Sequence, residues 1–361
     1  MNMSTAIESK STTLHEAWRG IQSAKPGIRI REAAKELGAS EAELLATKVG
    51  KDVVRLQGPW PELLKSFKSL GKVMSLTRND ACILEHKGPF QVIDIMGSGA
   101  HSVATVIGPI ETRVFFSAWH VAFAVTEEKS DRVLKSIQIF DKAGEAITKI
   151  YLQEKSIEEV YEKIINNFRS PDQSLELDVQ PYPAEEFSAS VNKEAFLADW
   201  SELKDTHDFF GMLRKHKVQR YHALELGEGK FTYQVDPQRT PNHILDSASA
   251  TKLPIMIFAG NRGNLQIHQG KVRTIRVLDR GHTGPERWLN ILDPDFNMHL
   301  KQNDVHKAWV VKKPTSDGEV TSIELFDREK NLIAQFFGLR KPGIHELEAW
   351  RKLVCEIQVL K

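Results

Sequence analysis

Cysteine is scarce in this sequence: Cys82 and Cys355 are the only two in 361 residues, and they form no CxxC pair. This scarcity excludes a scaffold held together by disulfides and gives no indication of a zinc ribbon. Long hydrophobic runs are also missing, because no stretch approaches the roughly 20 apolar residues that span a bilayer. The polar first dozen residues lack the apolar centre of a signal peptide. We therefore expect a cytoplasmic protein with reduced thiols and no membrane insertion.

An excess of charge of either sign is absent as well. The 49 Lys and Arg residues nearly balance the 48 Asp and Glu residues, for a formal net charge of +1, which does not indicate a dedicated binder of polyanions. Gly97-Ser98-Gly99 is a short glycine run without the third glycine of a dinucleotide-binding fingerprint. The composition is that of a globular protein, and the length allows two domains of ordinary size.

The order of helical and strand patterns divides the chain into two halves. We expect residues 1–13 to be disordered and residues 14–168 to form a first repeat, made of a helical pair, an antiparallel β-meander and a closing helix. Residues 169–195 contain three prolines and several Ser and Glu residues, which is typical of a linker. Residues 196–361 form the second repeat. The strands predicted in the first half are 81–84, 90–95, 112–116, 121–125, 136–140 and 147–151.

The second half repeats the first. Met74, Asn79 and His86 each have an identical residue 182 positions later, and the run 136–141 has a near copy 186 positions later. Because two separate blocks keep their register, a tandem duplication explains the matches better than chance does. The predicted fold class is therefore α+β, a tandem structural repeat in which each half forms a large antiparallel β-sheet with flanking helices.

Residues 30–46 have the outline of a helix-turn-helix. Two helices meet at Gly38, and Ser40 with Glu43 forms a capping box at the start of the second. A DNA-reading second helix needs Arg, Lys, Asn or Gln near its start, whereas this one offers Glu41 and Glu43. Because DNA repels these carboxylates, we favour a packed helical pair over nucleic-acid binding.

The stretch 205–216 contains the candidate ligand. Either of its first two residues can cap a helix, which places His207 in the first helical turn. At about 100° per residue, His207 and Gly211 share one face, whereas Phe209 and Leu213 point to another and can anchor the helix in a core. A flat ligand held by His207 can approach the backbone at Gly211, where no side chain blocks it. A surface or capping histidine is the alternative.

The duplication separates shared positions from private ones. Histidine occurs in both halves at two pairs of positions, which indicates a structural role. In contrast, His207 falls opposite Lys25, and Arg113 falls opposite His299. Features present in only one copy have diverged, and divergence is expected where one half contacts a ligand.

Several motifs, in the right order, resemble the HemS/ChuS/HmuS hemin-degrading family. The resemblance covers essentially the whole chain from residue 14 onward. The segments that match are 205–210 with 213–216, 113–116 with 119–120, 260–263, 309–315 and 337–343.

This resemblance implies a cytoplasmic bacterial protein of heme uptake, with heme b bound in a cleft. It implies His207 as the proximal axial ligand and Arg113 as the distal residue facing an open coordination position. Phe115 shares a strand face with Arg113 and can pack on the porphyrin, although a core position is the commoner place for an aromatic side chain. The basic residues implied for the propionates are Arg220, Lys301 and Arg328. No tyrosine lies in the segment 320–328, where the resemblance implies one.

The chemistry of these residue types agrees with the implied roles. Heme iron takes a neutral imidazole nitrogen, and the planar fork of arginine can hold a carboxylate bidentately. Two functions stay open: an enzyme that opens the macrocycle to release iron with an external electron donor, and a carrier that receives heme from an importer and passes it to an acceptor. A heme-responsive helix-turn-helix regulator is a third possibility. We expect one heme per chain, because only one half carries the helix histidine.

Overall fold

The computed structural model describes residues 3–188, 190–280, 286–341 and 343–357, which form two compact units. The first unit contains Met1–Arg78, Glu85–Pro183 and Asn261–Leu265, and the second contains Asn79–Leu84, Ala184–Gly260 and Gln266–Lys361. Two short segments, Asn79–Leu84 and Asn261–Leu265, therefore belong to the unit formed mainly by the other half of the sequence.

The first half of the sequence contains five helices, three 3-10 turns and nine strands within its described part. The helices are α1 (Met3–Ala24), α2 (Ile30–Leu37), α3 (Glu41–Ala46), α4 (Trp60–Ser66) and α5 (Glu158–Phe168), and the 3-10 turns are η1 (Phe67–Leu70), η2 (Gly99–His101) and η3 (Phe116–Ala118). The strands are β1 (Val53–Leu56), β2 (Gly71–Arg78), β3 (Cys82–Gly88), β4 (Val92–Met96), β5 (Val103–Ile107), β6 (Thr112–Phe115), β7 (Val121–Glu128), β8 (Val133–Phe140) and β9 (Ala146–Ser156).

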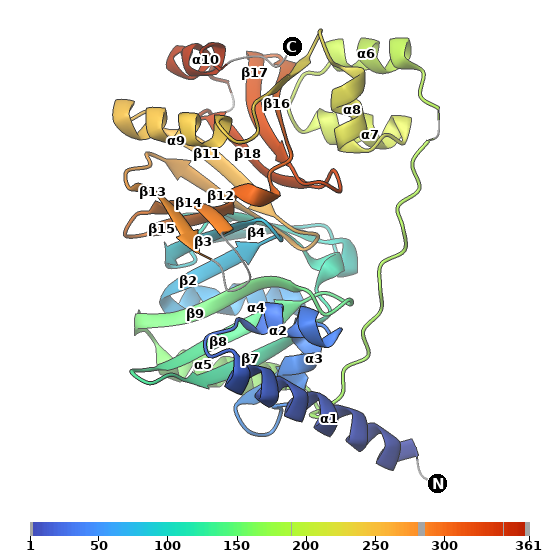
Figure 1. Ribbon diagram of the computed structural model, residues 1–361, viewed down its shortest axis with the longest axis vertical. Coiled ribbons are helices and arrows are strands. Elements are labelled where there is room, and N and C mark those ends of the chain that lie inside the picture. Colours follow the sequence, from blue (N-terminus) through green and yellow to red (C-terminus); the bar gives the residue numbers. More distant parts are fainter. Residues whose placement is uncertain (1–2, 189, 281–285, 342, 358–361) are drawn as a thin grey trace. The chain divides into compact units, whose positions relative to one another are not determined.

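The second half repeats this order in the residues that the structure describes (Figure 1). Its helices are α6 (Lys193–Ser201), α7 (Asp208–His216), α8 (Arg220–Leu226), α9 (Thr240–Thr251) and α10 (Glu348–Cys355), with the 3-10 turn η4 (Gln302–Asp304). Its strands are β10 (Thr232–Val235), β11 (Ile255–Gly260), β12 (Asn264–Gly270), β13 (Ile275–Arg280), β14 (Glu286–Leu292), β15 (Phe296–Lys301), β16 (Lys307–Thr315), β17 (Gly318–Phe326) and β18 (Leu332–Gly338).

The strands pair in two sheets, each of nine strands among the described residues. One sheet has the order β1-β7-β8-β9-β2-β3-β15-β14-β13, and the other has the order β10-β16-β17-β18-β11-β12-β6-β5-β4. The predicted α+β fold with large antiparallel sheets and flanking helices is confirmed. The sequence did not predict that each sheet takes strands from both halves.

The N-terminal helix differs from the expectation for this segment. Residues 1–13 are expected to be disordered, whereas α1 begins at Met3 and continues to Ala24. No Pro or Gly interrupts residues 3–19, so the helical pattern expected from residue 14 can extend toward the N-terminus.

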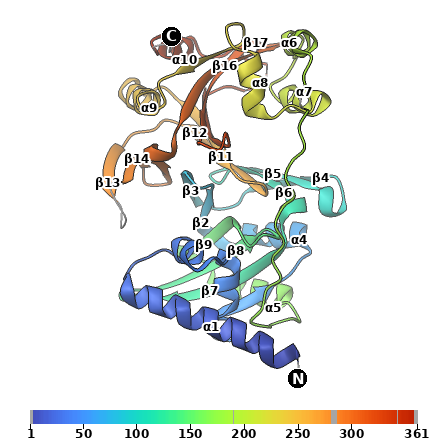
Figure 2. The ribbon, with the colours of Figure 1, turned by 45° about the vertical axis from the view of Figure 1, so that its right-hand side comes forward.

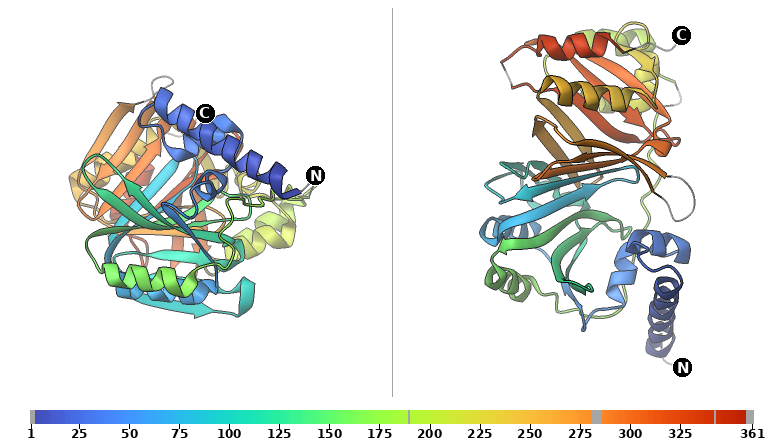
Figure 3. Two further views of the ribbon diagram at one scale, coloured as in Figure 1. Left: turned by 90° about the horizontal axis from the view of Figure 1, so that it is seen from below. Right: turned by 60° about the vertical axis from the view of Figure 1, so that its left-hand side comes forward.

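Strand β16 shows how the second unit buries its two sheet faces. Successive side chains of a strand point to opposite faces. Accordingly, Trp309 and Val311 pack with α6, α7 and α8, whereas Ala308 and Val310 pack with α9 and α10. Figure 2 shows the group of α6, α7 and α8, and Figure 3 shows α9 and α10 beside the strands of the same unit.

Strand β7 has the same arrangement in the first unit. Ala122 and Ala124 pack in the core that contains α4 and α5, whereas Phe123 and Val125 pack with α3. The equivalent residues of the two halves therefore have equivalent neighbours, as a tandem duplication predicts.

The repeated asparagines are structural residues. The side-chain amide of Asn79 donates to the carbonyl of Ile333 over 2.8 Å, and that of Asn261 donates to the carbonyl of Ile147 over 2.8 Å. The two acceptors are themselves 186 positions apart. A position shared by both halves thus has the same structural role in each.

The first part of the predicted linker is packed on the first unit. The Arg55 guanidinium binds the Asp172 carboxylate and the carbonyl of Ser174, and the ring of Tyr182 lies 4.4 Å from the Arg262 guanidinium carbon. Within the predicted linker 169–195, only the residues after Pro183 belong to the second unit.

The helices α2 and α3 form the packed pair favoured by the sequence. Ser40 and Glu43 form the predicted capping box, with the Ser40 N–H donating to Glu43 over 2.8 Å. Glu41 is buried and is paired with the buried Lys149 ammonium. Its carboxylate therefore contributes to the packing of the first unit.

Candidate functional site

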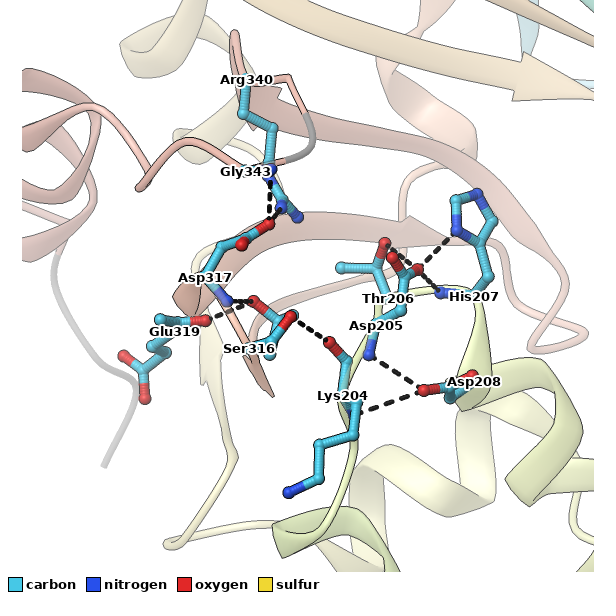
Figure 4. A network of polar contacts seen from close by, with 12 residues as sticks. Lys204, Asp205, Thr206, His207, Asp208, Ser316, Asp317, Glu319, Arg340 and Gly343 are labelled. Atoms are coloured by element: carbon cyan, nitrogen blue, oxygen red, sulfur yellow. Dashed lines mark hydrogen bonds and ion pairs between the residues drawn. The ribbon is translucent and has the colours of Figure 1, made fainter.

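A turn closed by two carboxylates positions His207 (Figure 4). The Asp208 carboxylate accepts the backbone N–H of Asp205 over 2.9 Å, and the Asp205 carboxylate accepts the backbone N–H of His207 over 2.8 Å. As a result α7 begins at Asp208, and His207 is the residue just before the helix rather than a member of its first turn.

The same Asp205 carboxylate orients the imidazole of His207. Its Oδ1 lies 2.5 Å from Nδ1 of the ring, and the His207 side chain is 93% exposed. The hydrogen bond from the His207 backbone holds the pKa of Asp205 below its usual value, so this carboxylate is an acceptor. In the neutral imidazole this acceptor favours the tautomer with the proton on Nδ1, which leaves the lone pair on Nε2, directed away from this bond.

A second set of hydrogen bonds fixes the turn itself. The carbonyl of Lys204 accepts the backbone N–H of Ser316 over 2.9 Å in the loop between β16 and β17. In the same loop, the Asp317 carboxylate accepts from the Arg340 guanidinium over 3.2 Å and from the backbone N–H of Gly343 over 2.9 Å (Figure 4). The His207 turn is thus tied to the strands of its own unit.

Helix α7 has a buried face and an exposed face. Phe209 and Leu213 are buried, which confirms their predicted role as anchors. On the exposed side, Phe210 is 61% exposed, and the Arg214 guanidinium carbon lies 4.9 Å from its ring centre. A Cβ added to Gly211 would meet no heavy atom within 4 Å. Internal packing therefore does not require a glycine at this position.

A cluster of charged side chains lies beneath α7. Glu324 is fully buried, and its carboxylate accepts two hydrogen bonds of 2.7 Å from the Arg220 guanidinium and one of 3.2 Å from the Lys313 ammonium. The ring of Phe209 covers both cations, with its centre 5.2 Å from the Arg220 guanidinium carbon and 4.7 Å from Nζ of Lys313. Two further polar side chains, Gln335 and Ser322, contact the same carboxylate.

This Glu324 cluster, defined by Arg220, Lys313 and Glu324, has one carboxylate for two cations. The two cations hold the pKa of Glu324 well below its usual range despite its burial. Burial, together with the charge of Arg220, lowers the pKa of Lys313 to about 8. Below that pH the cluster therefore carries one excess positive charge, which is costly for a buried group and favours an added carboxylate.

Replacing Lys313 by methionine tests this charge excess without any ligand. At pH 7 the Lys313→Met variant should be as stable as the wild type or more stable, by up to about 3 kcal/mol, because a buried charge is removed while Arg220 keeps its carboxylate partner. The pKa of Lys313 is lower in the folded than in the unfolded chain. Between pH 8 and 10.5 the unfolded wild type therefore binds more protons than the folded wild type. The free energy of unfolding of the wild type, relative to that of the variant, should rise with pH across that window.

Urea unfolding at pH 7 and at pH 9.5 measures this effect. Lys312→Met, a change on the same strand at a more exposed lysine, is the control. A Lys313→Met variant that loses several kcal/mol at pH 7 would contradict the assignment of an excess charge.

The sequence already contained a signal for this cluster. The positions of the first half that correspond to Arg220, Lys313 and Glu324 are Gly38, Glu127 and Gln138. All three residues are thus private to one repeat, as His207 is. Glu324 also lies in the segment 320–328, where the resemblance implies a tyrosine that this chain lacks.

In the first unit, Arg113 and Phe115 lie on β6. Their side chains are on its half-exposed face, whereas Thr112 and Val114 are buried, which confirms that Arg113 and Phe115 share a face. Thr105 of β5 is the cross-strand partner of Arg113.

Apolar side chains flank the position of Arg113 on the same three strands. Val103 of β5 lies between Phe115 and Met96 on one side, and Ile107 pairs with Val92 on the other. Met96, Ile107 and Val92 are 60%, 47% and 45% exposed. The row that contains Arg113 is polar, because Thr105 also pairs with Asp94 of β4, and Asp94 is exposed. Three neighbouring strands span about 10 Å, so this exposed face has apolar side chains on either side of a polar row.

The remaining two predicted basic residues are found elsewhere. The Lys301 ammonium, on β15, pairs with Glu286 at 2.9 Å and with Asp304 at 3.5 Å. Arg328 is exposed in the turn between β17 and β18. In the described part of the chain, neither is among the partners of Glu324, and both stay predicted contacts of the propionates.

Two further observations concern sites of other kinds. Across the residues that the structure describes, no group of three or more His, Cys, Asp or Glu side chains could hold a metal ion. Within the same residues, no helix is long and apolar enough to cross a membrane.

The sequence matches the profile of the haemin-degrading HemS.ChuX domain twice, over residues 38–168 and residues 217–357, once in each half. The chain therefore belongs to the HemS.ChuX family, as the resemblance predicted. It is 31% identical over 350 residues to the hemin transport protein HemS of Yersinia enterocolitica, across 96% of this chain and 98% of that protein.

Two solved structures share the whole fold. Holo-PhuS, a heme-binding protein from Pseudomonas aeruginosa, superposes with a TM-score of 0.91 at 37% identity and covers 97% of this chain and 99% of its own. ChuS, a heme-degrading enzyme of Escherichia coli O157:H7, superposes with a TM-score of 0.86 at 29% identity and covers 96% and 99%.

Proposed function

We propose that this chain binds heme b in bacterial heme utilisation, with His207 as the axial ligand. The observation that carries the proposal is the exposed imidazole of His207, whose Nδ1 is held by Asp205 so that Nε2 is available to iron. A carboxylate behind a metal-binding histidine fixes the ring orientation and raises its basicity. The family membership and the heme-binding relative PhuS support the same ligand.

Arg220 and Lys313 are the proposed partners of a heme propionate. Arg220 already gives Nε and Nη2 to Glu324, so its Nη1 is the group left for a second carboxylate. A propionate would neutralise the excess positive charge of the Glu324 cluster. Lys301 on β15 and Arg328 in the β17–β18 turn are the further basic residues predicted to contact the propionates.

Arg113 and Phe115 are the proposed distal residues. The apolar side chains on either side of the Arg113 row suit one face of a porphyrin, and a guanidinium there can hydrogen-bond a small ligand without ligating iron. Heme, when bound, supplies an iron that takes up oxygen and electrons. The residues of this chain supply the axial nitrogen, the apolar surface and the distal donor.

Gly211 offers a test that separates ligand binding from stability. In the Gly211→Leu variant, heme affinity should fall at least tenfold, because the new side chain stands where a flat ligand would lie. The variant should unfold at the same or higher urea concentration, since leucine is a better helix former than glycine by about 0.5–1 kcal/mol. Gly229→Leu is unsuitable as a control because its φ is positive, so Lys215→Leu on the same helix serves instead.

We further propose that the protein is cytoplasmic, receives heme from an importer and degrades it with an external electron donor to release iron. The heme-degrading relative ChuS supports the enzymatic reading. The hemin transport relative HemS supports the alternative, a carrier that passes heme to an acceptor.

One experiment distinguishes the two functions. The heme-loaded protein is mixed with a reductant in air, with and without catalase, while absorbance and released iron are recorded. Loss of the heme bands with stoichiometric iron release, unaffected by catalase, is the result expected for the enzyme. A stable bound spectrum would instead establish a carrier, and suppression by catalase would indicate bleaching by peroxide.

A further inference from the structure

Glu111 is the nearest charged neighbour of Arg113. It lies in the loop before β6, and its Oε1 is 3.3 Å from Nη2 of Arg113. This ion pair places the carboxylate beside the Arg113 guanidinium, although Glu111 itself precedes the strand. The Glu111 side chain is only 13% exposed, whereas that of Arg113 is 32% exposed. The ion pair is therefore partly shielded from water.

The Arg113 guanidinium is held at three points. Besides Glu111, its Nη1 donates weakly to the carbonyls of Thr112, over 3.3 Å, and Val106, over 3.5 Å. All three contacts are long for hydrogen bonds, but only the carboxylate carries a negative charge. It is consequently the group that attracts the guanidinium electrostatically and compensates its charge.

Both members of this ion pair are private to the first repeat. The positions 186 residues later are Asn297 for Glu111 and His299 for Arg113. The other copy thus has neither charge. Glu111 and Arg113 are thus both replaced in the second repeat, which is expected if the two residues act together.

We propose that Glu111 is a positioning residue that sets the location and the effective charge of Arg113, and thereby the attraction of the distal side for anionic ligands of the heme iron. This inference rests on the proposed function for its effect on ligands. Its structural part, that Glu111 restrains Arg113, does not need heme.

The first test uses the heme-free protein. Phenylglyoxal modifies guanidinium groups, and peptide mass spectrometry follows the peptide that contains Arg113. The Arg113 peptide should react several-fold faster in the Glu111→Gln variant than in the wild type. Glu127→Gln, which removes an exposed charge on β7 of the same unit, is the matched control and should leave the rate unchanged. Equal rates in Glu111→Gln and wild type would overturn the proposal.

The second test uses the ferric heme complex and two added ligands, azide as the anion and imidazole as the neutral ligand. Removing the Glu111 charge should tighten azide binding about 3- to 10-fold, as expected for unit charges a few ångströms apart in a partly solvated site. Imidazole affinity should stay within twofold. In the Arg113→Gln background, Glu111→Gln should have almost no effect on azide.

The outcomes separate this inference from the proposed function. An azide effect of equal size with and without Arg113 would contradict the positioning role, and so would no azide effect at all. A wild type that binds no heme would contradict the proposed function, and the modification rates would still decide whether Glu111 restrains Arg113.

Discussion

The His207→Ala variant should lose most of its heme affinity, by about 100-fold or about 3 kcal/mol. The physical reason is that the oriented Nε2 of His207 is the proposed iron ligand, and alanine offers no substitute. Titration of the heme-free protein, followed by the absorbance of the bound form, measures the loss. His222→Ala, on the neighbouring helix α8, is the control and should bind as the wild type does.

Asp205→Asn makes the same test more specific. Asparagine keeps the size of the side chain and can still accept a hydrogen bond from Nδ1, but it removes the charge that raises the basicity of the imidazole. We expect an intermediate loss of affinity, about 10-fold, in line with other groups that support a metal ligand. Equal affinity of wild type, His207→Ala and Asp205→Asn would overturn the ligand assignment.

The Glu324→Gln variant should be the most destabilised of the single changes considered for this chain. It leaves the buried Lys313 and the half-buried Arg220 without a carboxylate, and breaking a buried ion pair in this way costs about 3–5 kcal/mol. Urea unfolding at pH 7 measures the change. Glu319→Gln, at the exposed start of the same strand, should change stability by less than about 0.5 kcal/mol.

A second substitution checks the cause of this loss. Adding Lys313→Met to Glu324→Gln removes one of the two unpaired cations, so part of the lost stability should return. A double variant that is less stable than Glu324→Gln alone would show that the loss arises from packing and not from unbalanced charge.

Much of the fold could be predicted from local sequence patterns. The expected strands at 121–125 and 136–140 lie within β7 and β8, and the closing helix expected at the end of the first repeat is α5, which ends at Phe168. Apolar runs with turn residues between them are sufficient for such elements. Strands β1, β2 and β5 are absent from the predicted set, because each is short or has polar and small residues that interrupt its apolar pattern.

The exchange of short segments between the units could not be predicted in the same way. Asn79 and Asn261 are recognisable as repeated positions, but their identity does not say which sheet the strand after each of them joins. That choice depends on backbone pairing between distant residues, such as Lys301 with Ala81 and Phe115 with Gly263, which no local pattern specifies.

The candidate site shows the same division. His207, Arg113 and Phe115 each belong to a recognisable motif. The structure confirms the shared face of Arg113 and Phe115 on β6 and the burial of Phe209 and Leu213 on α7, but it places His207 just before α7 and not in its first turn. For the Glu324 cluster, the sequence analysis identifies Arg220 but not Lys313 or Glu324, which lie 11 residues from each other and, for Glu324, 104 residues from Arg220. A comparison of every charged residue with its counterpart in the other repeat is the sequence signal that points to this cluster.

The central claim is that one chain binds one heme through the second-repeat histidine. Titration of the wild-type protein with hemin under anaerobic conditions tests it most directly, with the absorbance of the bound form and the axial ligand followed on the same sample. The account predicts a single end point at one equivalent with the spectrum of a histidine-ligated heme. An end point at two equivalents of equal affinity, or no saturable binding, would contradict it.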